Sequence, residues 1–193
     1  MLDDNTTATP PAWREIDARS RVLGFDMPSE AGTGAMLRLL AASKPVGRLL
    51  ELGTGTGLAT AWLLDGMGQG ATLVSLDNDA RVQAVARAAL GDDPRVSFVL
   101  GDGLDHVRAQ PPASFDLIFA DAWPGKYDGL DETLALLRPG GLYVVDDMSR
   151  QPNWPEGHQP RVDVLTARLK SHPDLAPVAL DWASGLVIAA RRS

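Results

Sequence analysis

The residues best suited to hold a ligand form a glycine-rich segment behind an acidic residue. Residues 51–57 read Glu-Leu-Gly-Thr-Gly-Thr-Gly, with glycine at alternate positions. Glycines let the backbone turn sharply and bring its amide donors close to a ligand at a helix N-terminus. A dinucleotide fingerprint requires a third glycine three residues after the second, and Leu58 stands there instead. An acid ahead of the loop suits a ligand that carries a positively charged amine and a sulfonium, because opposite charges attract. The same acid would repel a pyrophosphate.

A second acidic residue marks the next apolar run. Asp77 ends residues 72–77 and stands twenty positions after Gly57. A carboxylate at this place can accept hydrogen bonds from the two hydroxyls of a ribose. The two segments together predict a site for a ligand that carries a ribose.

Three further carboxylates follow later apolar runs. Asp121 ends residues 115–121, whereas Asp146 and Asp147 stand at the end of residues 141–146. Carboxylates that meet at one edge of a sheet repel one another unless positive charge lies between them. A hard divalent cation such as Mg²⁺ meets that need, since it prefers oxygen ligands. Without a metal, Asp121 and Asp146 are strand-end residues, one of which serves as a base.

The elements that position these residues alternate along the chain. Short apolar runs at 48–52, 72–77 and 96–100, and then at 115–121 and 141–146, are separated by helical patterns. Runs that are apolar on both faces and separated by helices are typical of parallel strands between two helix layers. Ligands of such doubly wound sheets bind beyond the carboxyl ends of the strands.

The remaining elements complete the expected domain. Residues 13–23, the stretch around 36–40 and residues 161–172 each favour a helix. Residues 175–182 and 185–191 are strand-like, and their two-residue link suits a hairpin, so the last strand is antiparallel. We expect an α/β fold with a doubly wound, mostly parallel, seven-stranded Rossmann-like sheet.

Length and composition bound the classes of protein that this chain can belong to. The 193 residues suit one domain at 13–193, after a polar tail at 1–12 that we expect to be disordered. The absence of cysteine excludes disulfides, thiolate zinc sites and cysteine nucleophiles. A net charge of −7 argues against nucleic acid and anionic membranes as partners. The longest stretch without charged residues, 52–64, is too short to span a bilayer, and no signal peptide is visible, so we expect a cytoplasmic protein.

Residues 51–57, together with Leu76-Asp77, resemble the class I S-adenosylmethionine-dependent methyltransferases. The resemblance implies that Glu51, Gly53 and Gly55 hold the methionine end of the cofactor. It also implies that Asp77 binds the ribose and Asp102 contacts the adenine. The full set of implied cofactor residues is Glu51, Gly53, Thr54, Gly55, Gly57, Asp77, Asn78, Asp102, Gly103 and Asp121.

A narrower resemblance concerns the cation-dependent O-methyltransferases of the catechol and caffeoyl-coenzyme A type. It rests on Asp121-Ala122-Trp123 with Tyr127, on residues 145–147, and on residues 28–32. It implies that Asp121, Asp146 and Asp147 bind Mg²⁺ or another divalent cation. Such a cation would chelate two adjacent oxygens of a small acceptor and lower the pKa of one hydroxyl. Related enzymes often form homodimers.

Two positions differ from the pattern of that family. Its third metal ligand is Asn, where this chain has Asp147, and its catalytic Lys stands three residues after the first ligand, where this chain has Pro124. Lys126 is therefore one candidate for the general base, and His158, in the loop after the carboxylates, is another. Asp121 is the third candidate catalytic residue.

The acceptor site and the function leave alternatives open. Trp123, Trp154 and Trp182 are candidates for the walls of an aromatic acceptor pocket, although each also suits simple packing. We expect methyl transfer to an oxygen of a small, catechol-like or hydroxylated aromatic acceptor. The alternatives are a metal-independent methyltransferase, a nicotinamide-dependent oxidoreductase and a non-catalytic module that binds S-adenosylmethionine.

Overall fold

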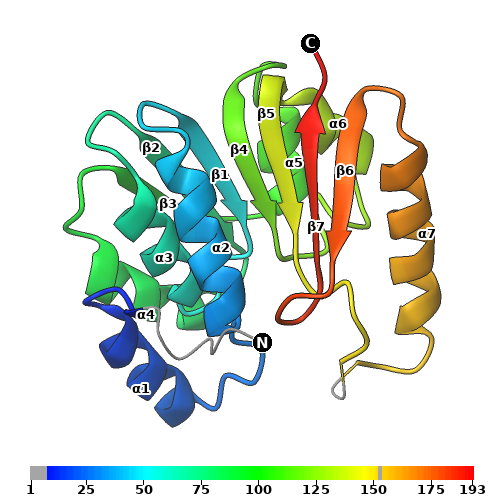
Figure 1. Ribbon diagram of the computed structural model, residues 1–193. Helices are drawn as coiled ribbons and strands as arrows, with labels where there is room; N and C mark the ends of the chain where they lie inside the picture. Colours follow the sequence, from blue (N-terminus) through cyan, green and yellow to red (C-terminus); the bar gives the residue numbers. More distant parts are fainter. Residues whose placement is uncertain (1–7, 152–153) are drawn as a thin grey trace.

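Seven strands form one sheet, and the first five of them run parallel. The computed structural model describes residues 8–151 and 154–193. The strand order is β3-β2-β1-β4-β5-β7-β6, and β7 runs antiparallel to both of its neighbours (Figure 1). The strands are β1 (Arg48–Leu52), β2 (Thr72–Asp77), β3 (Val96–Leu100), β4 (Phe115–Ala120), β5 (Leu137–Val145), β6 (Leu175–Leu180) and β7 (Leu186–Arg191). The predicted doubly wound sheet with an antiparallel last strand is confirmed.

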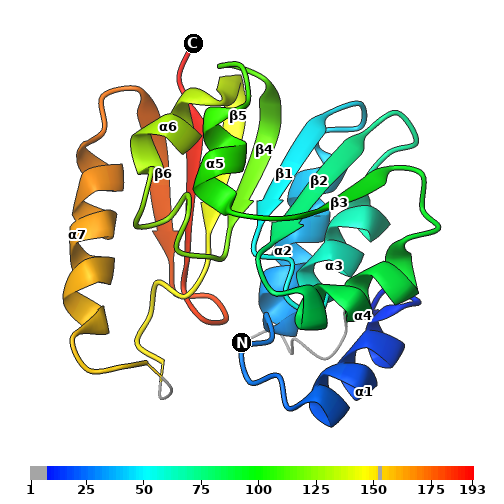
Figure 2. The same cartoon turned by 180° about the vertical axis from the view of Figure 1, so that it is seen from behind.

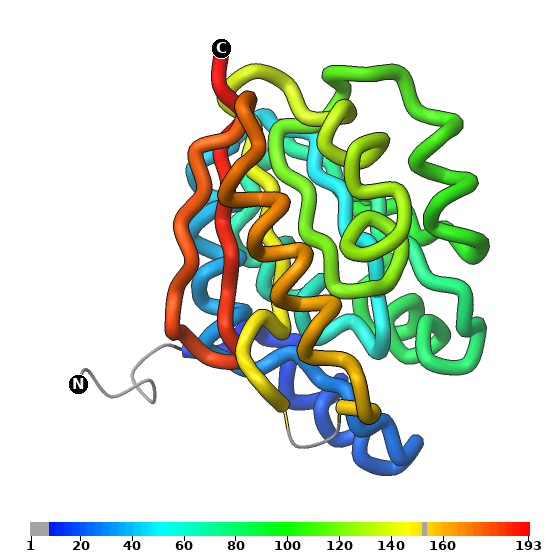
Figure 3. The backbone as a smooth tube through the Cα atoms, turned by 90° about the vertical axis from the view of Figure 1, so that its right-hand side faces the viewer, coloured from blue at the N-terminus to red at the C-terminus, as the bar shows by residue number. Residues whose placement is uncertain are grey.

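The helices cover both faces of this sheet. They are α1 (Trp13–Leu23), α2 (Ala31–Ala42), α3 (Leu58–Gly66), α4 (Ala80–Leu90), α5 (Gly103–Arg108), α6 (Leu130–Ala135) and α7 (His158–Ser171). Figures 1 and 2 show α2 and α3 on one face and α5 and α6 on the other. Two apolar clusters fill the layers, and Leu49 and Leu50 of β1 contribute to opposite ones because successive strand side chains point to opposite faces. The side view shows α7 beside the edge strand β6 (Figure 3).

The order of the strands explains where a ligand can bind. From β1 the chain winds outward to β2 and β3, and then returns to β4 on the other side of β1. At such a reversal, the connections after the two central strands turn in opposite directions and leave a crevice beyond their carboxyl ends. The glycine-rich segment follows β1, and Asp121 follows β4, so the fold brings both predicted sites to this crevice.

Several predicted boundaries differ by one or two residues, and two predicted starts are wrong by three or more. Both of these larger errors involve residues that usually end an element. Helix α7 begins at His158 rather than at 161, because Pro160 lies in its first turn, where a missing backbone N–H costs nothing. Strand β5 begins at Leu137 rather than at 141. It contains Gly140 in a left-handed conformation (φ 75°) and a register shift opposite β4. Asp121 and Asp146 lie just beyond their strands instead of within them.

The predicted tail lies partly outside the described residues, at 1–7. The rest of it contacts the domain: the Arg38 side chain donates a hydrogen bond to the carbonyl of Ala8 (3.0 Å), and Pro10 is buried. Within the described part of the chain, no helix combines the length and the apolar character needed to cross a bilayer.

Candidate active site

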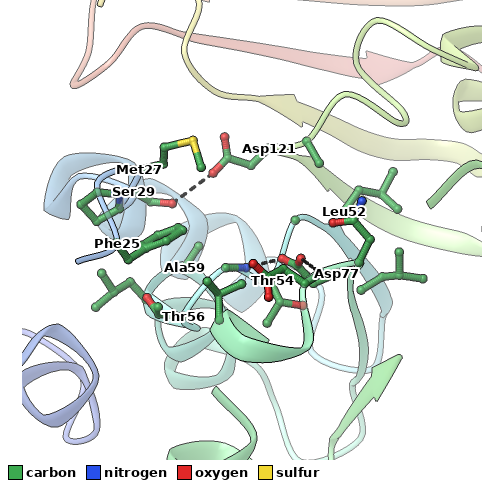
Figure 4. A pocket seen from close by; sticks show the side chains of 18 of the residues that line it. Phe25, Met27, Ser29, Leu52, Thr54, Thr56, Ala59, Asp77 and Asp121 are labelled. Carbon is green, nitrogen blue, oxygen red and sulfur yellow. Dashed lines mark hydrogen bonds between the residues drawn. The ribbon is translucent and has the colours of Figure 1, made fainter. Parts of the chain in front are cut away.

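A cavity of about 640 Å³ opens at the carboxyl ends of the central strands. Its wall combines the glycine-rich segment, the end of β2, the loop after β4 and the connection between α1 and α2. Figure 4 shows Asp77 and Asp121 in different parts of this wall. The predicted cofactor and metal residues that line the cavity are Gly53, Thr54, Gly55, Asp77, Asn78, Gly103, Asp121 and Asp147.

The glycine-rich segment has a backbone conformation that residues with side chains could adopt only with strain or steric clashes. Gly53, Gly55 and Gly57 have φ values of 103°, 52° and 96°, in the left-handed region that glycine enters at little cost. A Cβ atom on Gly53 would lie 2.9 Å from the carbonyl oxygen of Asp121, and one on Gly57 would lie 2.7 Å from the Cβ of Ala86. The glycines therefore permit the sharp turn and its close packing against the loop after β4 and against α4.

Asp77 connects this turn to β2. Its carboxylate accepts hydrogen bonds from the amides of Gly55 (2.7 Å) and Asp79 (2.9 Å). A carboxylate has about four acceptor positions, so Asp77 retains capacity for hydroxyl donors from a ligand. Its position in the wall agrees with the predicted binding of a ribose.

Glu51 lies beneath the turn and is fully buried; it does not line the cavity. Its Oε2 accepts hydrogen bonds from the hydroxyls of Ser75 (2.5 Å) and Thr60 (2.6 Å). Its Oε1 has no hydrogen-bond partner among the described residues. Burial raises the pKa of Glu51 to about 7, although the bonds from Ser75 and Thr60 partly offset that effect. Direct contact with the methionine end of a ligand remains a prediction, whereas support of the turn from below is seen.

Two further side chains that no motif indicated, Ser75 and Gln83, hold the glycine-rich turn through Thr54. The hydroxyls of Thr54 and Ser75 lie 2.7 Å apart, and the Gln83 amide donates to Thr54 (3.2 Å) and to the carbonyl of Val99 (2.8 Å). The Thr54 hydroxyl therefore bonds to side chains of β2 and α4. These partners are distant in sequence, so only their polar character inside apolar patterns could have indicated them.

Asp102 caps α5. Its Oδ1 accepts hydrogen bonds from the amides of Leu104 (2.8 Å) and Asp105 (3.0 Å), as N-cap residues do. Its neighbours Gly101 and Gly103 line the cavity, but Asp102 itself does not. Its predicted contact with adenine remains a prediction.

The connection between α1 and α2 closes another side of the cavity, which sequence reasoning largely missed. Phe25, Met27 and Ser29 belong to its wall, and Ser29 donates a hydrogen bond to Asp121 Oδ2 (3.2 Å, Figure 4). A Cβ on Gly55 would lie 3.1 Å from the Phe25 ring, so this ring packs directly over the turn. Only residues 28–32 had been indicated, by resemblance.

The three predicted metal ligands have different surroundings. Asp121 and Asp147 line the cavity, whereas Asp146 is buried and its Oδ1 accepts hydrogen bonds from the Ser184 hydroxyl and from the Asp147 amide (2.8 Å). Burial and the neighbouring carboxylates raise the pKa of Asp121 well above its usual range. Burial raises the pKa of Asp146 to about 6. Oxygen donors of this kind suit a hard cation chemically. However, within residues 8–151 and 154–193, no three His, Asp or Glu side chains converge as a metal site.

Lys126 is buried at 5% exposure and does not line the cavity. Its Nζ donates a hydrogen bond to the main-chain carbonyl of Asp146 (2.6 Å). The ammonium thus ties the loop after β4 to the loop after β5. Its use as a general base remains a prediction.

Aromatic side chains gather at the loop after β4, which forms part of the cavity wall. We call Trp123, Tyr127, Trp154 and His158 the aromatic cluster; the ring of His158 lies 4.5 Å from that of Trp154 and 5.4 Å from that of Tyr127. The Tyr127 hydroxyl and His158 Nε2 are 3.0 Å apart. Burial, followed by Lys126 and Arg161, lowers the pKa of His158.

One member of the predicted aromatic pocket lies elsewhere. The indole of Trp182, between β6 and β7, donates a hydrogen bond to the carbonyl of Gly32 (2.8 Å) at the start of α2. Of the three predicted tryptophans, Trp123 lines the cavity, whereas Trp154 and Trp182 do not. Their roles in an acceptor pocket remain predictions.

A doubly wound sheet of this order, with a glycine-rich turn after β1 and an acid ending β2, defines the class of S-adenosylmethionine-dependent methyltransferases. The family described as "Methyltransferase domain" matches residues 50–148. A protein of Mycolicibacterium vanbaalenii, provisionally named an O-methyltransferase, is 30% identical over 189 residues, which span 91% of this chain and 84% of the relative.

Solved structures agree with this assignment. The cofactor-bound structure of Rv0187 from MTB is 28% identical, covers 100% of this chain and 94% of its own, and has a TM-score of 0.85. The O-methyltransferase TomG from Streptomyces achromogenes, solved with S-adenosylmethionine, shares the fold at 24% identity, with a TM-score of 0.83 and coverage of 97% and 92%. This chain belongs to the methyltransferase domain family, as an S-adenosylmethionine-dependent O-methyltransferase. Membership of this family favours methyl transfer over two of the alternatives from the sequence, a nicotinamide-dependent oxidoreductase and a non-catalytic module that binds S-adenosylmethionine.

Proposed function

We propose that the protein transfers the methyl group of S-adenosylmethionine to a hydroxyl oxygen of a small aromatic acceptor, with assistance from a divalent cation. One observation carries this proposal. Two carboxylates, Asp121 and Asp147, and the half-exposed ring of Trp123 line the same cavity as the glycine-rich turn and Asp77. The cavity thus offers a cofactor region together with an acidic and aromatic region where a hydroxylated ring can lie.

The reaction is an in-line displacement at the methyl carbon. The acceptor oxygen forms a bond to that carbon while the bond from carbon to sulfur breaks, and the acceptor loses its proton. S-Adenosylhomocysteine and the methyl ether leave. In this proposal the glycine-rich turn and Asp77 hold the cofactor, so that its methyl group faces the acceptor. Positioning of two reactants in one cavity supplies much of the rate enhancement.

Asp121 is the residue of the wall best suited to receive the acceptor proton. Its pKa is raised by burial and by Asp146 and Asp147, so its carboxylate is a stronger base than an exposed aspartate. His158 and Lys126 are less well placed, since each is hydrogen-bonded outside the cavity wall, to Tyr127 and to the Asp146 carbonyl. Asp121 and Asp147 are also the residues that would hold a cation, which would lower the pKa of an acceptor hydroxyl when bound. Such a cation would also lower the pKa of Asp121, so Asp121 receives the proton only when no cation engages it, and otherwise the proton leaves to solvent.

Metal-independent transfer to the same acceptor is the second candidate. It is favoured by the arrangement of Asp146, whose Oδ1 is engaged by Ser184 and by the Asp147 amide. In that case Asp121 alone would receive the proton, and Lys126 would be the only positive charge beside the carboxylates that the described chain itself supplies.

Calorimetric titration and turnover test these proposals in order. S-Adenosylhomocysteine should bind at micromolar concentration, and NADH should not. Methylation of catechol is then measured with Mg²⁺ and again after exhaustive chelation. Turnover that disappears on chelation and returns with Mg²⁺ supports the cation, and turnover that persists supports the metal-independent reaction. Binding of the adenosyl product without methylation of any hydroxylated aromatic compound would refute the proposed acceptor class.

A further inference from the structure

An exposed cation stands beside the aromatic cluster and has no carboxylate partner among the described residues. Arg161, on the first turns of α7, places its guanidinium carbon 4.8 Å from the centroid of the Trp123 ring. Its side chain is exposed. Among residues 8–151 and 154–193, no carboxylate lies within ion-pair distance of it. Its five N–H donors can therefore meet an external anion.

Trp123 contacts both this cation and the cavity. The indole is 48% exposed and lines the cavity together with Asp121 and Asp147, whereas Arg161 does not line the cavity. Arg161 thus lies next to a residue of the wall without belonging to the wall itself. The other nearby cation, Lys126, is buried and donates to the Asp146 carbonyl, so it is not available to a ligand.

Stacking on an indole also prepares the guanidinium for recognition. A planar guanidinium over an aromatic ring is held in position by attraction to the ring face. Its fork of donors matches the two oxygens of a carboxylate. A guanidinium that is already oriented loses less entropy when it binds such a group.

We propose that Arg161 determines specificity for acceptors whose hydroxylated ring carries a carboxylate. The acceptor ring lies along Trp123, its hydroxyl reaches the cavity near Asp121, and its carboxylate meets Arg161. This inference rests on the proposed function, because it concerns the acceptor of that same reaction.

Equilibrium binding tests the inference without requiring turnover. Protein saturated with S-adenosylhomocysteine is titrated with 3,4-dihydroxybenzoate and with catechol, which differ only in the carboxylate. The variants are Arg161→Gln, Arg161→Lys and Lys170→Gln. Lys170 is an exposed residue near the end of the same helix and provides a matched removal of charge.

We expect the wild type to bind 3,4-dihydroxybenzoate more tightly than catechol. Arg161→Gln should weaken the binding of the carboxylated compound about tenfold, as loss of one charged contact does. Arg161→Lys should restore part of the affinity, while catechol binding and the Lys170→Gln variant remain at the level of the wild type.

Three results would overturn the inference: no preference for the carboxylated ring, an equal loss for both compounds in Arg161→Gln, or no binding of either compound. The proposed function fails by a different result. If S-adenosylhomocysteine itself does not bind, the cofactor site is at fault rather than Arg161.

Discussion

Glu51 is predicted to make the stability of the protein depend on pH. The folded protein raises the pKa of this residue from 4.5 to about 7, chiefly because burial disfavours the charged form. The folded state therefore binds this proton more tightly than the unfolded state does. The resulting stabilisation is complete below about pH 4.5 and is lost as the pH rises through about 7. Each unit of pKa shift corresponds to about 1.4 kcal/mol, so the whole effect is about 3 kcal/mol.

The Glu51→Gln variant removes this titration. As the pH rises from about 5 to about 8, the loss of the stabilisation from Glu51 should lower the free energy of unfolding of the wild type by about 2.5 kcal/mol. The variant should not show this loss. Its amide also places donors near the position of Oε1, which has no partner among the described residues, so the variant has a constant penalty as well. The prediction therefore concerns the difference between the two pH profiles and not the stability at a single pH.

Urea denaturation at a series of pH values measures this difference. Asp121 and Asp146 also have raised pKa values, but they are present in both proteins and cancel in the comparison. Glu30→Gln is the control, since Glu30 is exposed and its replacement removes the same charge. If the profiles of the wild type and of Glu51→Gln run parallel, Glu51 ionises as easily in the folded protein as in the unfolded chain. The argument from burial would then be refuted.

Two further substitutions test the cofactor site and the link between the loops. Asp77→Asn should weaken binding of S-adenosylhomocysteine about tenfold or more in calorimetry, since it removes a charged acceptor from the cavity wall, and an unchanged Kd would contradict the predicted ribose contact. Lys126→Met should lower the free energy of unfolding by about 2–3 kcal/mol in urea denaturation, because it leaves the Asp146 carbonyl without its charged donor. Unaltered stability of Lys126→Met would mean that this hydrogen bond contributes nothing.

The strands were predictable from sequence because burial on both faces leaves continuous apolar runs. Residues 48–52, 72–77 and 96–100 form strands with the predicted bounds. The starts of α7 and β5 were not predictable in this way, since Pro160 and Gly140 usually interrupt elements. Each is tolerated here for a local reason. Pro160 lies in the first helical turn, where the backbone N–H has no partner within the helix. Gly140 has a left-handed backbone in a strand whose register against β4 is shifted.

The candidate site was predictable only where a backbone constraint or a strand end specifies the residue type. Gly53, Gly55 and Asp77 belong to that group, and all three line the cavity. The partners that hold them, such as Ser75 and Gln83, join segments that are far apart in sequence. No spacing rule relates such residues, because the sheet alone brings them together.

The position of Lys126 shows how a small shift in sequence changes what a residue can do. The family that this chain resembles has its catalytic Lys three residues after the first ligand, and here Pro124 occupies that place. The Trp123 carbonyl accepts hydrogen bonds from the amides of residues 126, 127 and 128, which closes a tight turn. Gly125 lies within this turn at a φ of 83°. A lysine two positions later therefore lies on the far side of the turn, where its ammonium meets the Asp146 carbonyl.

This geometry gives Lys126 a structural role at a place where the resembled family has its catalytic lysine nearby. Inside the cavity, Asp121 lines the wall and Lys126 does not, so the proton acceptor that we propose is a carboxylate. Beneath the cavity, the ammonium joins the loops that carry Trp123 and Asp147. Asp147 itself has a left-handed backbone (φ 54°), a conformation that aspartate tolerates better than most residues and that neighbouring contacts must maintain. Loss of Lys126 should therefore disturb acceptor binding through Asp147 even if Lys126 never receives a proton.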